Sequence, residues 1–146
     1  MATDITATIE IKKWAVEVAA FAAHPDNATK WQVNIKSVDW KSPPPLRVGT
    51  RFVFGSSSFG RKISLPFEVV KFAPGEQLIM RNSGDAFPKE IIYTWRPSEM
   101  GGTQMKMIQR GELTGLSRIF SIFSIRALQR SAAESLARLK TVIEAR

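Results

Sequence analysis

The sequence predicts an α+β protein in which a curved antiparallel sheet of seven strands wraps around one long C-terminal helix. Three observations predict this class. Most of the chain between Thr3 and Leu113 alternates apolar with polar side chains, which is the period of strands that bury one face. Short stretches rich in glycine, proline and serine separate these runs, so successive strands can pair as an antiparallel meander. The remaining residues, Leu113 to Arg146, change to helical spacing.

The first elements are a strand and two short helices. The range Thr3 to Lys12 alternates strictly and predicts a strand. Trp14 to His24 is alanine-rich and predicts a helix, which Pro25 ends because proline lacks the backbone N–H that a helix needs. Asp26 is a suitable N-cap for a second, shorter helical segment that reaches Trp31.

Six further strands follow the two short helices. The predicted ranges are Val33 to Lys41, Thr50 to Ser56, Arg61 to Phe72, Glu76 to Ser83, Pro88 to Arg96 and Thr103 to Leu113. The link after the first of these contains Pro43, Pro44 and Pro45, which cannot donate ladder hydrogen bonds. The other links are short and contain glycine, as turns between paired strands do.

The C-terminal helix has an apolar face that is broad at its start and narrow at its end. The broad part comprises Leu116, Ile119, Phe120, Ile122, Phe123, Ile125 and Leu128. From Ala132 onward the pattern thins to a one-sided stripe. Thr114 is available as the N-cap of this helix. A helix that is apolar over about half its circumference must be covered on more than one side, so the sheet is expected to wrap around its first turns.

Composition excludes several classes of function. The chain has no cysteine and one histidine, which excludes disulfides, thiolate chemistry and a His/Cys metal cage. Phosphate-loop, dinucleotide and nucleophile-elbow motifs are lacking, so no cofactor is predicted. The net charge of +8 is spread without any run of four basic residues. A nucleic-acid partner is therefore not predicted, while weak association with an anionic membrane surface stays open. The cysteine-free chain fits a cytoplasmic location.

The residue types that carry acid–base chemistry are not arranged for it. His24, followed by Pro25, is typical of a helix C-cap. The strand carboxylates Glu68, Glu90 and Glu112 alternate with apolar neighbours and are expected to point away from the core. No paired carboxylates result, and no catalytic residue is predicted.

The apolar sheet face and the broad helix face together predict a ligand cavity. Its expected lining is Phe52, Phe54, Phe67, Met80, Tyr93, Trp95, Met105, Met107, Gln109, Phe120 and Phe123. A packed core is the alternative interpretation of this set. Tyr93 and Gln109, with Asn82 as a further candidate, favour the cavity, because aromatic and methionine walls with a few polar groups are typical of small-molecule sites. A drug-sized ligand would need a volume of about 300 to 1,000 Å³.

Serines recur on the C-terminal helix in two sets with a spacing of seven or fourteen, one containing Ser131 and the other Ser135. Small polar residues of this kind can permit close packing, bond back to the helix backbone, or line the polar part of a cavity. The first two roles are favoured from the sequence.

Five co-linear segments carry a resemblance to a known family. They are His24 to Trp31, Val48 to Phe52, Phe72 to Glu76, Gly102-Thr103 and Gly111 to Gly115. In this order they resemble the START-like superfamily (SRPBCC), which includes lipid-transfer domains, pollen-allergen proteins and polyketide cyclases. The similarity is to the polyketide cyclase/dehydrase-like branch and extends over the whole chain, residues 1–146, as one domain. It implies a helix-grip fold that holds a hydrophobic ligand between sheet and helix.

Three hypotheses for function follow. The first is binding of a hydrophobic or amphipathic small molecule, lipid or polyketide-like, between the sheet and the C-terminal helix. The second is a cyclase or dehydratase that shapes a reactive polyketide in a dry pocket and uses no metal or nucleotide cofactor. The third is an interaction module that uses the basic surface.

Overall fold

The computed structural model describes residues 2–58, 61–112 and 118–146, of which residues 2, 58, 61 and 118–124 are described by their backbone only. The elements, in chain order, are β1 Ala2–Ile11, α1 Ala15–Ala23, the 3₁₀ helix η1 Pro25–Asn27, α2 Ala28–Trp31, β2 Ile35–Trp40, β3 Arg51–Ser58, β4 Arg61–Ala73, β5 Gln77–Asn82, β6 Glu90–Pro97, β7 Thr103–Glu112 and α3 Arg118–Glu144.

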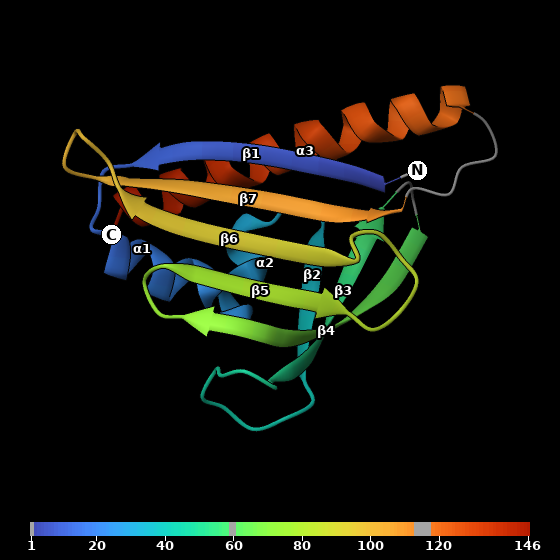
Figure 1. Ribbon diagram of the computed structural model, residues 1–146, viewed down its shortest axis with the longest axis horizontal. Helices are drawn as coiled ribbons and strands as arrows, with labels where there is room; N and C mark the ends of the chain where they lie inside the picture. Colours follow the sequence, from blue (N-terminus) through green and yellow to red (C-terminus); the bar gives the residue numbers. More distant parts are fainter. Residues whose placement is uncertain (1, 59–60, 113–117) are drawn as a thin grey trace.

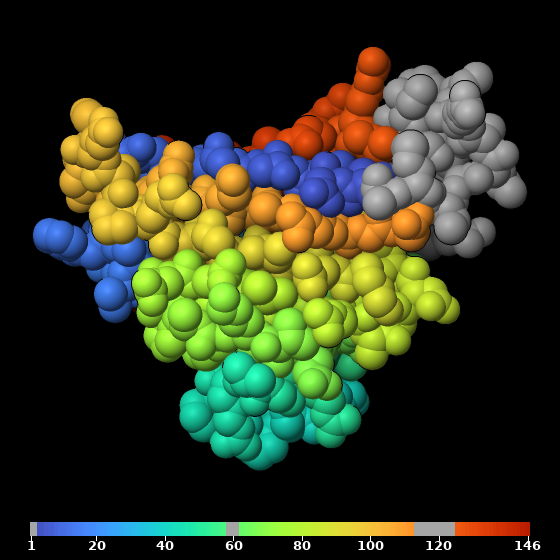
Figure 2. All heavy atoms as spheres, viewed as in Figure 1, coloured from blue at the N-terminus to red at the C-terminus, as the bar shows by residue number. Residues whose placement is uncertain are grey.

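The strands form one seven-stranded sheet in the order β1-β7-β6-β5-β4-β3-β2, and all neighbouring pairs are antiparallel. Helix α3 runs along β1 on one face of the sheet, and α1 and α2 lie on that same side (Figure 1). Among the described residues no helix covers the outer face of β5, β6 and β7, which faces the viewer in Figures 1 and 2. The predicted α+β class, with its two short helices after the first strand, is confirmed.

Two register shifts help the sheet to curve around α3. One lies between Ile35 and Ser37 where β2 pairs with β3, and the other between Val69 and Lys71 where β4 pairs with β5. An extra residue in one strand of a pair increases the local twist and bends the strand. At the first shift a Cβ atom on Gly55 would collide with the Ser37 hydroxyl, so the glycine leaves room for that side chain.

The prediction that Asp26 caps the second helix is wrong. Asp26 lies inside η1, and Asn27 occupies the N-cap position of α2. The reason is that Pro25 already has the backbone angle of a helical first position and begins a 3₁₀ turn there. Asp26 instead donates its backbone N–H to His24 Nδ1 at 3.2 Å and accepts from Trp40 Nε1 at 2.7 Å.

The ends of α3 compare with the prediction as follows. The described helix begins at Arg118, and residues 113–117, with the proposed cap Thr114, lie outside the described residues. At its other end the helix stops at Glu144.

Strand β2 is shorter than predicted, since Val33 and Lys41 lie outside it. The backbone N–H of Val33 bonds to the Ser135 side chain on α3 instead of to a neighbouring strand.

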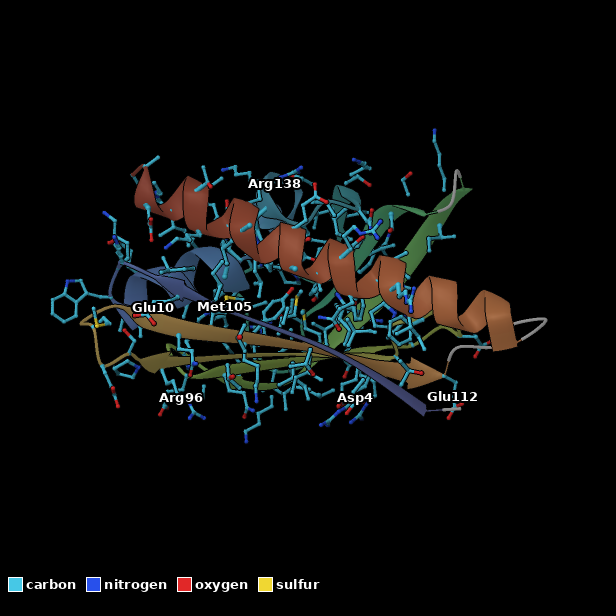
Figure 3. The ribbon with its side chains drawn as sticks, turned by 90° about the horizontal axis from the view of Figure 1, so that it is seen from above. Asp4, Glu10, Arg96, Met105, Glu112 and Arg138 are labelled. Carbon is cyan, nitrogen blue, oxygen red and sulfur yellow. The ribbon has the colours of Figure 1, made fainter. Side chains whose placement is uncertain are left out.

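One end of the space under α3 is a closed apolar core. We call it the closed end and define it by Ile11, Val18, Leu136, Leu139 and Ile143, each no more than 1% exposed. Helix α1 contacts β6, β7 and α3 and covers this end. Figure 3 shows Met105 on the α3 side of the sheet and Arg96 on the far side. Met105 and the residues of the closed end belong to one hydrophobic cluster that fixes the last turns of α3.

Hydrogen bonds hold α3 along β1. The Glu144 carboxylate accepts from Lys140 Nζ at 2.7 Å and from the backbone N–H of Lys12 at 2.8 Å. Lys140 Nζ also donates to the Glu10 carbonyl at 2.8 Å, and Gln129 Nε2 donates to the Thr6 carbonyl at 2.7 Å. The hydrogen bond from Lys140 and, second, that from Lys12 lower the pKa of Glu144, because both donors favour the ionised carboxylate.

Candidate ligand cavity

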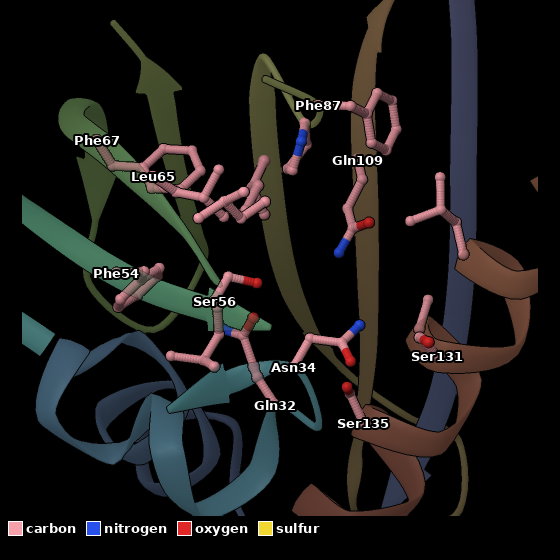
Figure 4. Close-up of a pocket in the computed structure, with 16 residues that line it drawn as sticks. Gln32, Asn34, Phe54, Ser56, Leu65, Phe67, Phe87, Gln109, Ser131 and Ser135 are labelled. Atoms are coloured by element: carbon pink, nitrogen blue, oxygen red, sulfur yellow. The ribbon is translucent and has the colours of Figure 1, made fainter. Parts of the chain in front are cut away.

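A cavity of about 80 Å³ lies between the sheet and the middle of α3 (Figure 4). Its lining is Gln32, Asn34, Ile35, Phe54, Ser56, Ile63, Leu65, Phe67, Phe87, Pro88, Ile91, Gln109, Leu128, Ser131, Ala132 and Ser135. We call this region the cavity end. Its lining comes from the segment after α2, from β2, β3, β4, β6, β7 and α3, and from the link between β5 and β6.

One wall of the cavity is apolar. Phe54 of β3 and Phe67 of β4 pair in an edge arrangement with ring centroids 5.8 Å apart. Leu65 lies opposite Phe54 in the sheet and shares its face of β4 with Phe67. Phe87 and Pro88, from the link between β5 and β6, add further apolar lining. Aromatic walls of this kind bind apolar surface through burial and ring contacts.

Asn82 positions that link. It is fully buried, and its Nδ2 donates to the carbonyls of Ala86 and Pro88, both at 3.1 Å. Its Oδ1 accepts the Gly84 N–H at 2.7 Å. Asn82 was a candidate polar group of the pocket. Its side chain instead satisfies the backbone of the link that carries Phe87 and Pro88.

The opposite wall is polar. Gln32 and Asn34 come from the segment that joins α2 to β2. Ser56 is polar too, but it lies two residues from Phe54 on the same face of β3 and adds a hydroxyl at the edge of the apolar wall. Ser131 and Ser135 lie four residues apart on α3 and therefore face the same side of the helix. The sequence favoured packing or backbone bonding for these serines. The structure places both against the cavity, and Ser135 Oγ also accepts the Val33 N–H at 3.1 Å.

Tyr93 stands behind this polar wall. Gln32 Nε2 donates to the Tyr93 hydroxyl at 2.6 Å, so Gln32 connects the cavity with a phenol that is itself 1% exposed. The Tyr93 ring packs between Trp31 and Trp95, with centroids at 5.7 and 6.0 Å. Burial raises the pKa of the Tyr93 phenol, and the bond from Gln32 offsets only part of that shift. The hydroxyl therefore stays protonated at physiological pH.

No ionisable side chain is found among the described residues that line the cavity. His24 is half-exposed at the end of α1, where its ring contacts Trp40. Glu68 and Glu112 are exposed, and Glu90 contacts Arg81 and Arg110 at 3.4 and 4.0 Å. Within the described ranges no cluster of His, Cys, Asp or Glu could hold a metal ion. The cavity therefore offers hydrogen bonds and apolar surface without formal charge.

The predicted lining residues divide into three groups. Phe54, Phe67 and Gln109 line the cavity. The second group is buried in the surrounding core without lining the cavity: Phe52, Met80, Tyr93, Trp95, Met105 and Met107. The side chains of Phe120 and Phe123 lie outside the described residues. The cavity volume of about 80 Å³ is smaller than the expected range of about 300 to 1,000 Å³.

The polar lining residues that the sequence analysis did not assign to the cavity are Gln32, Asn34 and Ser56. Gln32 lies between the predicted elements. Asn34 and Ser56 fall at the ends of predicted strands, where a polar side chain on the inner face is not distinguished from one that faces solvent. The serines of the last helix were noted, but their positions could not by themselves distinguish a cavity from close helix packing.

Residues 2–144 match the model of the family described as polyketide cyclase / dehydrase and lipid transport. The chain belongs to this family, and membership implies a cavity for a hydrophobic ligand. No curated protein matches the chain.

Solved structures show the same fold. The protein TTHA0849 from Thermus thermophilus superposes with a TM-score of 0.81 at 12% identity, covering 98% of each chain. A START superfamily protein from Mycobacterium smegmatis gives 0.71 at 16% identity, covering 97% of this chain and 94% of the other. The Aha1 dimer from Colwellia psychrerythraea gives 0.67 at 18% identity, covering 97% and 96%. Identities this low show a shared helix-grip fold. In the described part of the chain no helix is long and apolar enough to cross a membrane.

Proposed function

We propose that the protein binds a small hydrophobic or amphipathic molecule, lipid or polyketide-like, in the cavity between the sheet and α3. One observation carries the proposal: an aromatic wall at Phe54 and Phe67 faces a wall of uncharged polar groups across one cavity. The apolar part of the ligand would lie against the aromatic wall, and its polar group would face Asn34 and Ser131. The family, which includes lipid-transport proteins, supports this assignment.

Binding requires the cavity to widen. A volume of about 80 Å³ is enough for a few water molecules but not for a lipid chain. Gln109, Leu128 and Ser131 are only half-buried, so changes in their side-chain rotamers can enlarge the space at low cost. We therefore expect ligand binding to turn these side chains, while the closed end keeps its packing.

A cyclase or dehydratase using the same cavity has less support. Acid–base catalysis needs a titratable group within reach of the substrate, and the described lining contains none. Tyr93 lies behind Gln32 with a raised pKa, which makes its phenol a weak acid at neutral pH. Such an enzyme would have to act by positioning alone.

The basic-surface module also has less support. Arg110 contacts both Asp4 and Glu90, and Arg81 contacts Glu90, in a ladder across β1, β7, β6 and β5. This ladder pairs two of the cations of the outer sheet face with carboxylates, which reduces their attraction for an anionic partner.

Two matched substitutions on α3 test the binding proposal. Ala132 lines the cavity, whereas Ala133 is exposed. Ala132→Leu adds three carbon atoms to the cavity, so displacement of the uncharged fluorescent probe N-phenyl-1-naphthylamine by decanol should be lost. Ala133→Leu makes the same change outside and should leave displacement unchanged. Native mass spectrometry of freshly purified wild-type protein and both variants should show a co-purified molecule that only Ala132→Leu lacks.

Melting temperatures confirm that both variants are folded, since overpacking can itself destabilise. Equal displacement in folded Ala132→Leu and Ala133→Leu would contradict the proposal, as would a wild-type protein that binds neither N-phenyl-1-naphthylamine nor any co-purified molecule.

A further inference from the structure

We infer that the cavity selects ligands whose buried polar group is uncharged and both donates and accepts hydrogen bonds, such as a hydroxyl or a primary amide, over the matching carboxylate. This inference rests on the proposed function and specifies its ligand class. It follows from the identity, the existing hydrogen bonds and the surroundings of the polar side chains in the cavity.

The polar wall keeps both donors and acceptors available. Ser135 Oγ accepts the Val33 N–H, so its own O–H remains to donate into the cavity. Gln32 uses its amide nitrogen on Tyr93, so its carbonyl oxygen remains as an acceptor. Asn34, Ser56 and Ser131 make no side-chain hydrogen bond to another described residue, and each can both donate and accept.

Three cations that stand next to lining residues make their contacts with residues outside the lining. Lys36, next to the lining residue Ile35, donates its Nζ to the Val33 carbonyl at 3.2 Å. Lys89, next to Pro88, donates its Nζ to the Gly84 carbonyl at 3.0 Å. Arg110, next to Gln109, contacts Asp4 and Glu90 on the opposite face of the sheet. No cation among the described lining residues could therefore compensate a buried carboxylate.

Ligand chemistry decides what this wall can bind. A carboxylate only accepts hydrogen bonds, carries a full charge and loses its hydration when buried without a cation. A hydroxyl or amide both donates and accepts, and its desolvation can be balanced by Asn34 and the serines. We expect the neutral group to be favoured by at least about tenfold in Kd.

The test compares three ligands with the same ten-carbon chain: 1-decanol, decanamide and decanoate, titrated at pH 8 by calorimetry below their critical concentrations. The wild-type protein should bind decanol and decanamide at least about tenfold more tightly than decanoate. Equal or tighter binding of decanoate would overturn this inference and leave the proposed function standing. If none of the three binds, the proposed function itself fails.

A matched pair of variants tests whether the polar group of the ligand lies in the cavity. Gln109 and Gln104 lie on opposite faces of β7, one lining the cavity and the other exposed. Gln109→Lys adds a cation to the cavity and should reverse the preference toward decanoate, whereas Gln104→Lys should keep the wild-type order. Ser131→Lys on α3 repeats the test if Gln109→Lys does not fold. An unchanged order in a folded cavity variant would overturn the inference, because the polar group would then lie elsewhere.

Discussion

The closed end and the cavity end share one helix and one sheet, yet their interiors differ. At the closed end, Leu136, Leu139 and Ile143 of α3 are no more than 1% exposed and pack among apolar neighbours. At the cavity end the same helix presents Ser131, Ala132 and Ser135. A turn of helix with small side chains leaves volume where a turn with leucines fills it. One helix can therefore anchor the fold with its last turns and border a binding site with its middle.

The sheet repeats this difference along β7. Met105 and Met107 are fully buried on the α3 side, whereas Gln109, two residues further along the same face, is half-buried and lines the cavity. The change from thioether to amide occurs where the facing helix changes from leucine to serine. Because both partners change together, we interpret the cavity as a feature of the sequence and not as a packing defect.

The largest predicted effect tests the closed end. Leu139→Ala should lower the free energy of unfolding by about 2 to 5 kcal/mol, since it leaves a hole among tightly packed side chains. Urea denaturation measures this loss. Decanol affinity should remain at the wild-type value in folded protein, and a marked fall would mean that the two ends are not independent.

Leu128→Ala makes the same change at the cavity end of α3. Leu128 is half-buried and already borders empty space. The loss in unfolding free energy should stay below about 2 kcal/mol, because fewer contacts are removed. Decanol affinity should change, since the wall that the ligand contacts has moved. A loss of stability equal to that of Leu139→Ala would contradict the distinction between the two ends.

Tyr93→Phe probes the boundary between the ends. The substitution removes the hydroxyl that accepts from Gln32 and keeps the ring between Trp31 and Trp95. We expect a loss of about 0.5 to 1.5 kcal/mol in unfolding free energy, because a buried hydrogen bond is removed. Decanamide affinity should fall as Gln32 loses its fixed orientation. A variant with unchanged stability and unchanged binding would show that this bond orders neither region.

The strands could be predicted well because each buries one face, and a strand of this kind shows alternating apolar and polar side chains in the sequence. Phe54, Phe67 and Gln109 could be assigned to the inner face for the same reason. Alternation cannot say which inner residues touch empty volume, so Met105 and Trp95 could not be separated from the true lining.

The rest of the site depends on contacts between distant segments. Gln32 reaches the cavity because α2 ends beside α3. Asn82 orders the link between β5 and β6 through hydrogen bonds to three backbone groups, and no hydrophobic pattern in the sequence indicates these bonds. The N-cap of α2 lies at Asn27 and not at the predicted Asp26, because the fixed backbone angle of Pro25 begins a 3₁₀ turn there. Such features follow from tertiary packing and from single backbone angles, which hydrophobic patterns do not encode.

The smallest predicted effect concerns the bonds of Glu144 at the closed end. Its pKa is lowered from a usual value of 4.5, first by the hydrogen bond from Lys140 and then by that from Lys12. A carboxyl whose pKa is lower in the folded state stabilises the fold fully above its unfolded pKa, and loses that contribution as pH falls through its folded pKa. Glu144→Gln should therefore melt slightly below wild type at pH 7, and the difference should shrink in the acid range below pH 4.5. Glu134→Gln, at an exposed position of the same helix, is the control and should show no such convergence. Thermal melts from pH 7 downward measure both differences. A gap between wild type and Glu144→Gln that persists at the lowest pH would mean that the amide disturbs packing at the closed end, and that the ionised carboxylate is not what holds α3 to Lys12.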